Sequence, residues 1–215
     1  MSSRDVILNR IRRAVADLPE DDTPYERAID RGYRRRHGDL SPAGAVDLLE
    51  RNLVDYRALV HRATAAELPA VLARLLGKRG ARTVVVPAGL PPKWLAAAEV
   101  EAVPDDVSHT PERLDAVDSV VTGCAVAVAE TGTLVLDGGP DQGRRRISLV
   151  PDHHICVVRV PDQVVQGVPE ALDRLDPVRP LTWISGPSAT SDIELDRVEG
   201  VHGPRTLEVV LVGEG

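Results

Sequence analysis

Three short clusters of hydroxyl, carboxylate, imidazole and guanidinium side chains could carry chemistry in this sequence. The first is Glu130, Thr131, Gly132 and Thr133, which follows a long apolar segment. A half-buried glutamate at such a place could act as a base, a nucleophile or an anchor. The structural alternative is a paired carboxylate followed by a glycine that serves a tight turn, and these four residues alone favour that alternative.

The second cluster, residues 185–194, offers four hydroxyls and two carboxylates directly after a predicted strand. Hydroxyls and backbone N–H groups in such a loop can bind an anion. Alternatively, one of the hydroxyls only caps a short helix. The lysine of a phosphate-binding P-loop is missing. The candidate ligand-binding residues here are Ser185, Gly186, Ser188, Thr190 and Asp192.

The third cluster, residues 200–205, places His202, Gly203 and Arg205 between turn-forming residues. An imidazole and a guanidinium together could hold a carboxylate or a phosphate. The alternative is a histidine that only hydrogen-bonds within the turn. Arg146 belongs to an arginine run that could close over an anionic ligand, although solvated runs of this kind are common.

Two adjacent histidines, His153 and His154, follow a proline in the same half of the chain. Neighbouring residues of a strand point to opposite faces of the sheet, so these two side chains cannot easily bind one metal ion. The sequence therefore gives no support for a metal site.

Alternating helical and strand patterns must position these clusters. A possible serine cap precedes the first helix, Thr64 and Glu67 form a capping-box signature, and Gly77 is expected to close the helix that follows. A polar, turn-rich connection spans residues 19–42, and a hairpin-like excursion is expected over 133–150. Helices are expected over 6–18, 43–62, 68–76, 92–98, 110–116 and 169–175, and strands over 83–87, 100–103, 133–136, 155–160, 181–184 and 207–212.

This alternation predicts an α/β domain over residues 41–215, with a mostly parallel, Rossmann-like sheet and flanking helices. Residues 1–40 are expected to form an N-terminal helix and an irregular arm. In open α/β sheets, ligands bind at the carboxyl ends of the strands, so we expect a cleft at that edge of the sheet.

The composition narrows the function classes. Hydrophobic residues make up 43% of the 215 residues and charged residues 27%, with a net charge of −7. The charge argues against a nucleic-acid partner. Neither a membrane-spanning apolar run nor a signal-peptide pattern is present, which predicts a cytoplasmic protein. The two cysteines are too few and too far apart for an iron–sulfur ligand set, so we expect no cofactor in this chain.

Taken together, four runs resemble the LUD domain family of lactate utilization protein C. They are residues 121–136, residues 146–151 with His154, residues 185–194 and residues 200–205, and the resemblance covers roughly residues 40–213. It implies the fold shared by glucosamine-phosphate isomerases, ribose-phosphate isomerases and CoA transferases. It also implies membership of a three-protein system that oxidises L-lactate to pyruvate, in which partner proteins carry the iron–sulfur clusters.

Three functional hypotheses follow. The first is an accessory, non-redox component of that system, with a small anionic ligand in a cleft formed by the three clusters; Arg205 would be the counter-ion and Asp192 an orienting group. The second is a free-standing enzyme of the isomerase or CoA-transferase type, with Glu130 as base or nucleophile. The third is an assembly scaffold that uses the arginine-rich arm, residues 31–36, and the 43–62 helix as contacts.

Overall fold

The computed structural model describes residues 2–17, 29–30, 32–190, 198–199 and 203–213. Internal contacts divide the chain into two units, with the boundary between Arg34 and Arg35. In the first unit, helix α1 (Ser3–Ala14) begins at Ser2, whose hydroxyl accepts a hydrogen bond from the Asp5 amide. The predicted serine cap is therefore confirmed.

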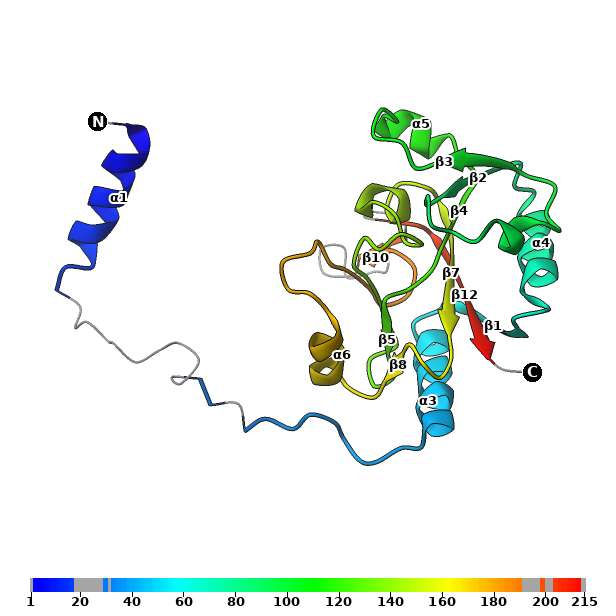
Figure 1. Cartoon of the computed structure of the whole chain (residues 1–215), viewed down its shortest axis with the longest axis horizontal. Coiled ribbons are helices and arrows are strands. Elements are labelled where there is room, and N and C mark those ends of the chain that lie inside the picture. Colours follow the sequence, from blue (N-terminus) through cyan, green and yellow to red (C-terminus); the bar gives the residue numbers. More distant parts are fainter. Residues whose placement is uncertain (1, 18–28, 31, 191–197, 200–202, 214–215) are drawn as a thin grey trace. The chain divides into compact units, whose positions relative to one another are not determined.

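The second unit is built on a six-stranded sheet in which every neighbouring pair is parallel (Figure 1). The β-branched runs predicted as strands form its centre, and both of its faces are buried, as is typical of parallel sheets. In spatial order the strands are β1 (Leu59–Thr64), β12 (Thr206–Gly213), β7 (His153–Arg159), β4 (Ser119–Thr122), β2 (Thr83–Val86) and β3 (Glu101–Pro104).

A second sheet of four strands mixes parallel and antiparallel pairs. The sequence indicated only a hairpin-like excursion in this region, and the separate sheet is a new finding. Its order is β8 (Val164–Val165), β5 (Val126–Val128), β6 (Thr133–Leu136) and β9 (Thr182–Ile184); a short antiparallel pair, β10 (Ala189–Thr190) and β11 (Val198–Glu199), lies apart from both sheets.

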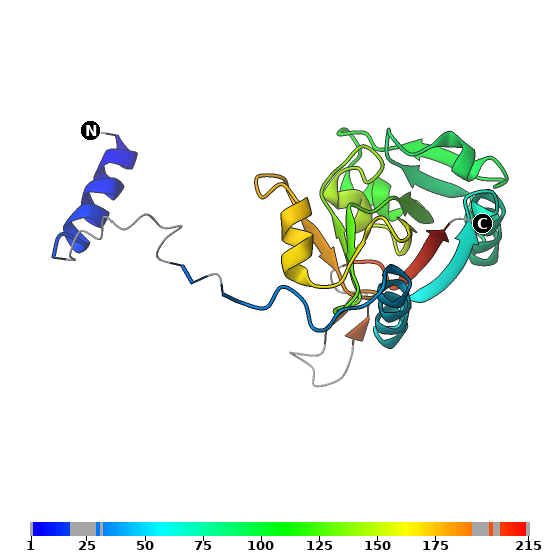
Figure 2. The ribbon, with the colours of Figure 1, turned by 60° about the horizontal axis from the view of Figure 1, so that its bottom comes forward.

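The helices cover the sheets in layers. Leucines of α4 pack on one face of the main sheet, whereas α3 and the second sheet pack on the other. Helix α6 covers the second sheet, and Figures 1 and 2 show α4 and α6 on opposite sides of this unit. The helices are α3 (Pro42–Asp55), α4 (Leu68–Arg79), α5 (Pro111–Asp115) and α6 (Val168–Arg174), with single 3-10 turns η1 (Pro92–Leu95) and η2 (Arg145–Ser148).

The expectation of an α/β architecture is confirmed, but several helix boundaries were wrong. The expected 6–18 helix ends at Ala14, and the expected 92–98 helix is a 3-10 turn over Pro92–Leu95. The predicted 43–62 helix ends at Asp55, because Arg57 adopts a left-handed backbone with φ of 67° and the chain then enters β1.

Gly77 lies inside α4, and the left-handed residue that ends this helix is Gly80. Thr64 and Glu67 form the two reciprocal bonds of the predicted capping box, but these bonds close a turn before the helix. Helix α4 begins at Leu68, with Glu67 as its N-cap and no side-chain cap bond.

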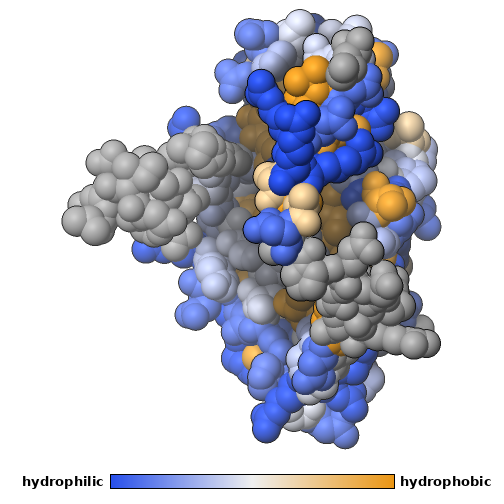
Figure 3. All heavy atoms as spheres, turned by 90° about the vertical axis from the view of Figure 1, so that its left-hand side faces the viewer, coloured by the Kyte–Doolittle hydropathy of each residue, from blue (hydrophilic) through white to orange (hydrophobic). Residues whose placement is uncertain are grey.

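Hydrophilic residues cover most of the face drawn in Figure 3, and hydrophobic residues appear there in separate groups between them. A surface of this composition is ordinary for a folded protein in water. No helix in the described part of the chain is long and apolar enough to cross a membrane.

Candidate functional site

Gly132 of the first cluster and Gly186 of the second allow both clusters to pack closely against the end of helix α3. Gly132 and Gly186 have φ values of 57° and 81°, which favour glycine. A Cβ atom at Gly132 would lie 2.8 Å from the carbonyl carbon of Asn52, and one at Gly186 would lie 2.4 Å from the Tyr56 carbonyl oxygen. Asn52 also donates its side-chain amide to the Ala129 carbonyl at 2.7 Å. The glycines are therefore required for this close approach.

A chain of hydroxyls connects the two clusters. Strands β6 and β9 pair, with Leu134 opposite Ile184, which brings Thr133 next to Ser185. The Thr133 hydroxyl lies 2.8 Å from the Ser185 hydroxyl and 2.7 Å from that of Thr131. Residues more than 50 positions apart thus form one hydrogen-bonded row.

The second and third clusters meet as well, because the Ser188 amide donates to the Pro204 carbonyl at 2.8 Å. Between them lies a cavity of about 230 Å³, which we call the serine cavity. Its size suits a small molecule. The lining residues are Ser148, Leu149, His154, Thr182, Trp183, Ile184, Ser185, Gly186, Pro187, Ser188, Gly203, Pro204 and Leu207.

The wall of the serine cavity combines polar and apolar side chains. None of its described lining residues carries a charged side chain, apart from the titratable imidazole of His154. That ring is 1% exposed, and burial, with a smaller effect of His153, lowers the pKa of His154 to about 3. Because the imidazole is neutral near pH 7, the described wall offers hydroxyl and backbone groups to a ligand, but no charge.

Glu130 is not among the residues that line this cavity, and its carboxylate binds the arm. Its carboxylate accepts hydrogen bonds from the His37 amide at 2.7 Å and from the Gln166 side chain at 3.3 Å. Burial raises the pKa of Glu130, but these hydrogen bonds outweigh it, so the pKa lies below its ordinary value. A carboxylate held ionised in this way suits an anchor, and its predicted catalytic role stays a prediction.

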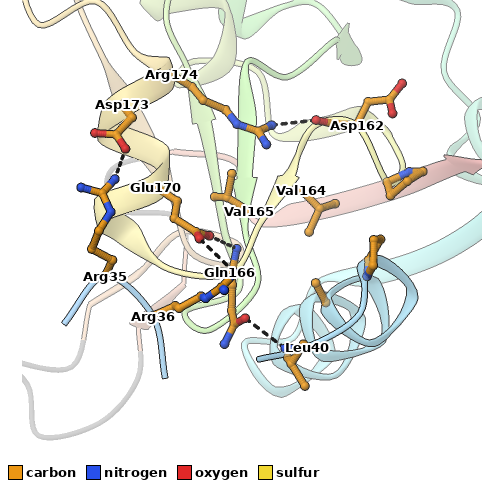
Figure 4. A pocket seen from close by; sticks show the side chains of 13 residues that line it. Arg35, Arg36, Leu40, Asp162, Val164, Val165, Gln166, Glu170, Asp173 and Arg174 are labelled. Atoms are coloured by element: carbon orange, nitrogen blue, oxygen red, sulfur yellow. Dashed lines mark hydrogen bonds and ion pairs between the residues drawn. The ribbon is translucent and has the colours of Figure 1, made fainter. Parts of the chain in front are cut away.

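A larger cavity, of about 670 Å³, lies beside this anchor, between residues 35–45, β8 and α6. Figure 4 shows Arg35 and Asp173 pointing toward each other at one side of this cavity, and the two side chains form an ion pair. Arg36 pairs with Asp39 at 2.9 Å, and Arg174 donates to the Asp162 carbonyl at 2.7 Å. The arginines of this arm cavity are therefore bound by the protein's own acceptors.

The remaining predicted residues do not join the serine cavity in the described structure. Arg146 donates to the His109 carbonyl at 2.9 Å, and Arg205 lies 3.3 Å from the Asp152 carboxylate with its side chain 65% exposed. Thr190 is described only as a residue of strand β10. Asp192 and His202 lie outside the described residues.

The serine cavity is not at the carboxyl edge of the main sheet, where we expected the cleft. Residues 203–205 precede β12, and His154 is the second residue of β7, so the cavity lies at the amino ends of these two strands. The serine-rich loop does not lie at that edge because it leaves β9, a strand of the second sheet that the sequence did not separate from the first. The ligand cleft expected at the carboxyl edge stays a prediction.

At the carboxyl edge, near the point between β2 and β4 where the strand order reverses, the turn at residues 137–143 borders a cavity of about 370 Å³ that Ala88 and Asp105 also line. The turn at residues 137–143 accepts a hydrogen bond from the Gly89 amide at the Pro140 carbonyl, 2.8 Å away. It accepts another from the Gly123 amide at the Asp141 carbonyl, 2.7 Å away. This turn therefore lies beside the position where α/β sheets usually bind a ligand.

The two histidines face opposite sides of the sheet, as predicted. His153 Nδ1 lies 2.8 Å from the Ser119 hydroxyl, whereas His154 Nε2 lies 2.8 Å from the Thr122 hydroxyl. On the His153 side, a buried row continues through Glu208, 3.4 Å from His153 Nε2, to His61 at 2.5 Å. The sequence did not reveal this row, because strand register alone brings its members together.

Both cysteines belong to the core. Cys124 and Cys156 are buried, and their thiols donate to the Val126 and Gly123 carbonyls respectively. A hydrogen bond with Cys124, together with burial, raises the pKa of Cys156 well above its ordinary value. Metal and cluster ligands are thiolates, so the raised pKa of Cys156 fits a structural role for this residue.

A parallel sheet joined to a smaller mixed sheet, with a small uncharged cavity where β7, β9 and β12 meet, defines the chain as a two-sheet α/β protein. The model of the LUD domain matches residues 46–212. Lactate utilization protein C of Deinococcus radiodurans is 47% identical over 212 residues, covering 96% of this chain and 94% of that protein. This chain belongs to the LUD domain family.

Two further similarities extend the comparison. The crystal structure of a DUF162 family protein from Deinococcus radiodurans superposes with a TM-score of 0.70 at 45% identity, covering 81% of this chain and all of that one. Lactate utilization protein C of Bacillus subtilis is 34% identical over 105 residues, which span 44% of this chain and 42% of that protein. The two-sheet fold is therefore shared with a solved structure.

Proposed function

We propose that this chain is a cytoplasmic, non-redox component of a system that oxidises L-lactate to pyruvate, and that its serine cavity binds a small carboxylate. The observation that carries the proposal is the 47% identity, over nearly the full length, to a lactate utilization protein C. Iron–sulfur proteins are its proposed partners, and they would supply the redox centres. The fold we propose for it is that of the isomerases and CoA transferases named above.

The chemistry of the chain supports a non-redox role. An iron–sulfur cluster usually takes four cysteine thiolates, whereas this chain has two cysteines, both buried as thiols. Hydroxyls and backbone amides can hold a carboxylate without a guanidinium, by donating hydrogen bonds to its oxygens. The serine cavity offers such donors from Ser185 and Ser188, at a size that suits a three-carbon acid.

An affinity pull-down from lactate-grown cells under anaerobic conditions tests the proposal, with an untagged strain as the control. We expect iron–sulfur proteins to co-purify, and lactate-dependent dye reduction by the eluate but not by the purified chain. Dye reduction by the chain alone would contradict the non-redox role. Recovery of a solitary, inactive chain would contradict membership of a complex and would favour the isomerase or CoA-transferase hypothesis.

A further inference from the structure

The cavity of about 370 Å³ at the carboxyl edge of the main sheet, which we call the edge cavity, differs from the serine cavity in its charge. It is lined by Ala88, which follows the end of β2, and by Asp105, which directly follows β3. Open α/β sheets bind ligands at this edge, close to the point where the strand order reverses. The position of the edge cavity therefore fits a ligand site.

The carboxylates around the edge cavity are already paired with arginines. Three of them, at the turn of residues 137–143 or beside it, form ion pairs: Asp105 with Arg144 at 2.7 Å, Asp137 with Arg179 at 2.7 Å, and Asp141 with Arg159 at 3.5 Å. The Asp105 side chain, which lines the cavity, is 6% exposed and also accepts from the Arg144 amide at 2.8 Å. Each of these carboxylates therefore has its charge compensated within the protein.

Arg145 brings a positive charge that has no such partner. It lines the edge cavity, is exposed, and its guanidinium forms neither a hydrogen bond nor an ion pair with any other residue that the structure describes. The arginines on either side of it are both bound, Arg144 to Asp105 and Arg146 to the His109 carbonyl. Among the described lining residues, the charged side chains are one carboxylate and two guanidinium groups. The cavity thus carries one excess positive charge, although the whole chain has a net charge of −7.

The rest of the wall includes small and apolar residues. Leu136, Pro140 and Pro180 line the cavity. Gly138 leaves space open, because a Cβ atom built there would lie 3.7 Å from the Gly143 carbonyl oxygen and 4.0 Å from Pro180. At about 370 Å³ the cavity falls within the range of small-molecule sites. A guanidinium beside apolar walls suits a ligand that has both an anionic group and an apolar part.

We propose that the edge cavity binds a small organic anion, whose carboxylate or phosphate pairs with Arg145 while its apolar part lies against Leu136, Pro140 and Pro180. A guanidinium recognises both anionic groups, because its N–H donors match two oxygens of either. Arg145 does not line the serine cavity, so this site is additional to the carboxylate site of the proposed function and does not depend on it.

Amide NMR spectra of the full-length protein, titrated separately with benzoate, phenyl phosphate and benzyl alcohol, test the proposal. The three probes carry the same ring with a carboxylate, a phosphate or no charge. We expect at least one of the two anions to shift the Gly138 and Gly139 signals saturably, and benzyl alcohol to bind at least about fivefold more weakly. Saturation by only one anion identifies which anionic group the site takes.

Glycine signals also separate the two cavities, which adjoin because Ser148 and Thr182 line both. Gly138 and Gly139 line the edge cavity, whereas Gly186 and Gly203 line the serine cavity. Shifts confined to the second pair would place the probe in the serine cavity and overturn the inference. Absence of saturable shifts with both anions would overturn it as well.

Two arginine substitutions isolate the role of Arg145. Arg145→Gln should weaken binding of the anion at least about fivefold, and the same spectra show whether the variant is folded. Arg74→Gln removes the same charge from an exposed position of α4 and should bind within about twofold of the unmodified protein. Equal binding by Arg145→Gln and the unmodified protein would overturn the inference. Membership of the lactate-oxidising system is decided separately by the pull-down.

Discussion

The carboxylate of Glu130 accepts a hydrogen bond from the backbone amide of His37 at 2.7 Å. A glutamate that sequence analysis marks as a candidate base thus holds the arm that leads into α3. Gln166 reinforces this contact, because its side chain accepts from the Leu40 amide and donates to the His37 carbonyl. The segment before α3 is therefore fastened to the second sheet at two points.

Replacing Glu130 with alanine should release the arm. Loss of a hydrogen bond to a charged acceptor costs roughly 1.5–3 kcal/mol, so local opening should become at least about fivefold more frequent. Trypsin cleavage after Arg35 and Arg36 reports that opening. Glu130→Gln keeps an acceptor oxygen, so its cleavage rate should lie between those of the unmodified protein and the alanine variant. Glu99→Ala, at an exposed position, serves as the matched control. Cleavage of the alanine variant at the unmodified rate would contradict the anchoring role.

Glycine-to-alanine substitutions should have opposite effects at two positions. Gly186→Ala should lower the free energy of unfolding by more than about 2 kcal/mol, since the left-handed backbone and the Tyr56 carbonyl both exclude a Cβ atom. Gly77→Ala, in α4 with open space around it, should raise it by about 0.5–1 kcal/mol. Urea denaturation of the two variants measures both changes. An unchanged free energy of unfolding in Gly186→Ala would show that the second cluster does not pack closely against the end of α3.

Buried His154 should make the fold sensitive to mild acid. Its pKa of about 3 in the folded protein lies below the ordinary value of 6.5, so only the unfolded chain takes up this proton between those limits. Stability is therefore lost as the pH falls from about 6.5, with a contribution of roughly 1.4 kcal/mol per pH unit. Unfolding free energies measured from pH 7 to pH 5 should fall less steeply in His154→Leu. Parallel curves for the two proteins would rule the prediction out.

Glu208 should cause a separate decrease in the free energy of unfolding at lower pH. Burial raises its pKa, but the contacts with His153 and His61 outweigh burial, so the pKa lies below the ordinary value of 4.5. The stability that this carboxylate contributes is complete above that value and is lost as the pH falls through the folded pKa. In Glu208→Gln the decline below about pH 4.5 should be weaker than in the unmodified protein, as measured by chemical denaturation. An unchanged decline in Glu208→Gln would show that the Glu208 carboxylate does not contribute this stability.

Local sequence signals predicted much of the fold, because caps and buried runs act over a few residues. The Ser2 cap and the buried run at β2 correspond to observed structure, and Thr64 and Glu67 form their predicted bonds one turn ahead of the helix start. The prediction that the helix from residue 43 continues to Arg62 was wrong, because the chain turns at Arg57. Val60 keeps the apolar spacing by coincidence, whereas the left-handed turn at Arg57 has no sequence signature of its own.

The candidate site was predictable only in part, because its assembly depends on pairing between distant strands. The motifs supplied Ser185, Ser188 and Gly203, but the pairing of β9 with β6 determines where the serine loop lies. His154 joins them through the register of β7 and β12, which no local pattern encodes.

The most direct test of the central claim is lactate-dependent dye reduction by the complex rebuilt from purified partners and this chain. Ser188→Phe should fill the serine cavity, and Val107→Phe adds the same ring at an exposed loop as the control. We predict no activity from the chain alone, full activity with the control, and a loss of at least about tenfold with the folded Ser188→Phe variant. Dye reduction by the chain alone, or full activity with Ser188→Phe, would contradict a non-redox component that acts through this cavity.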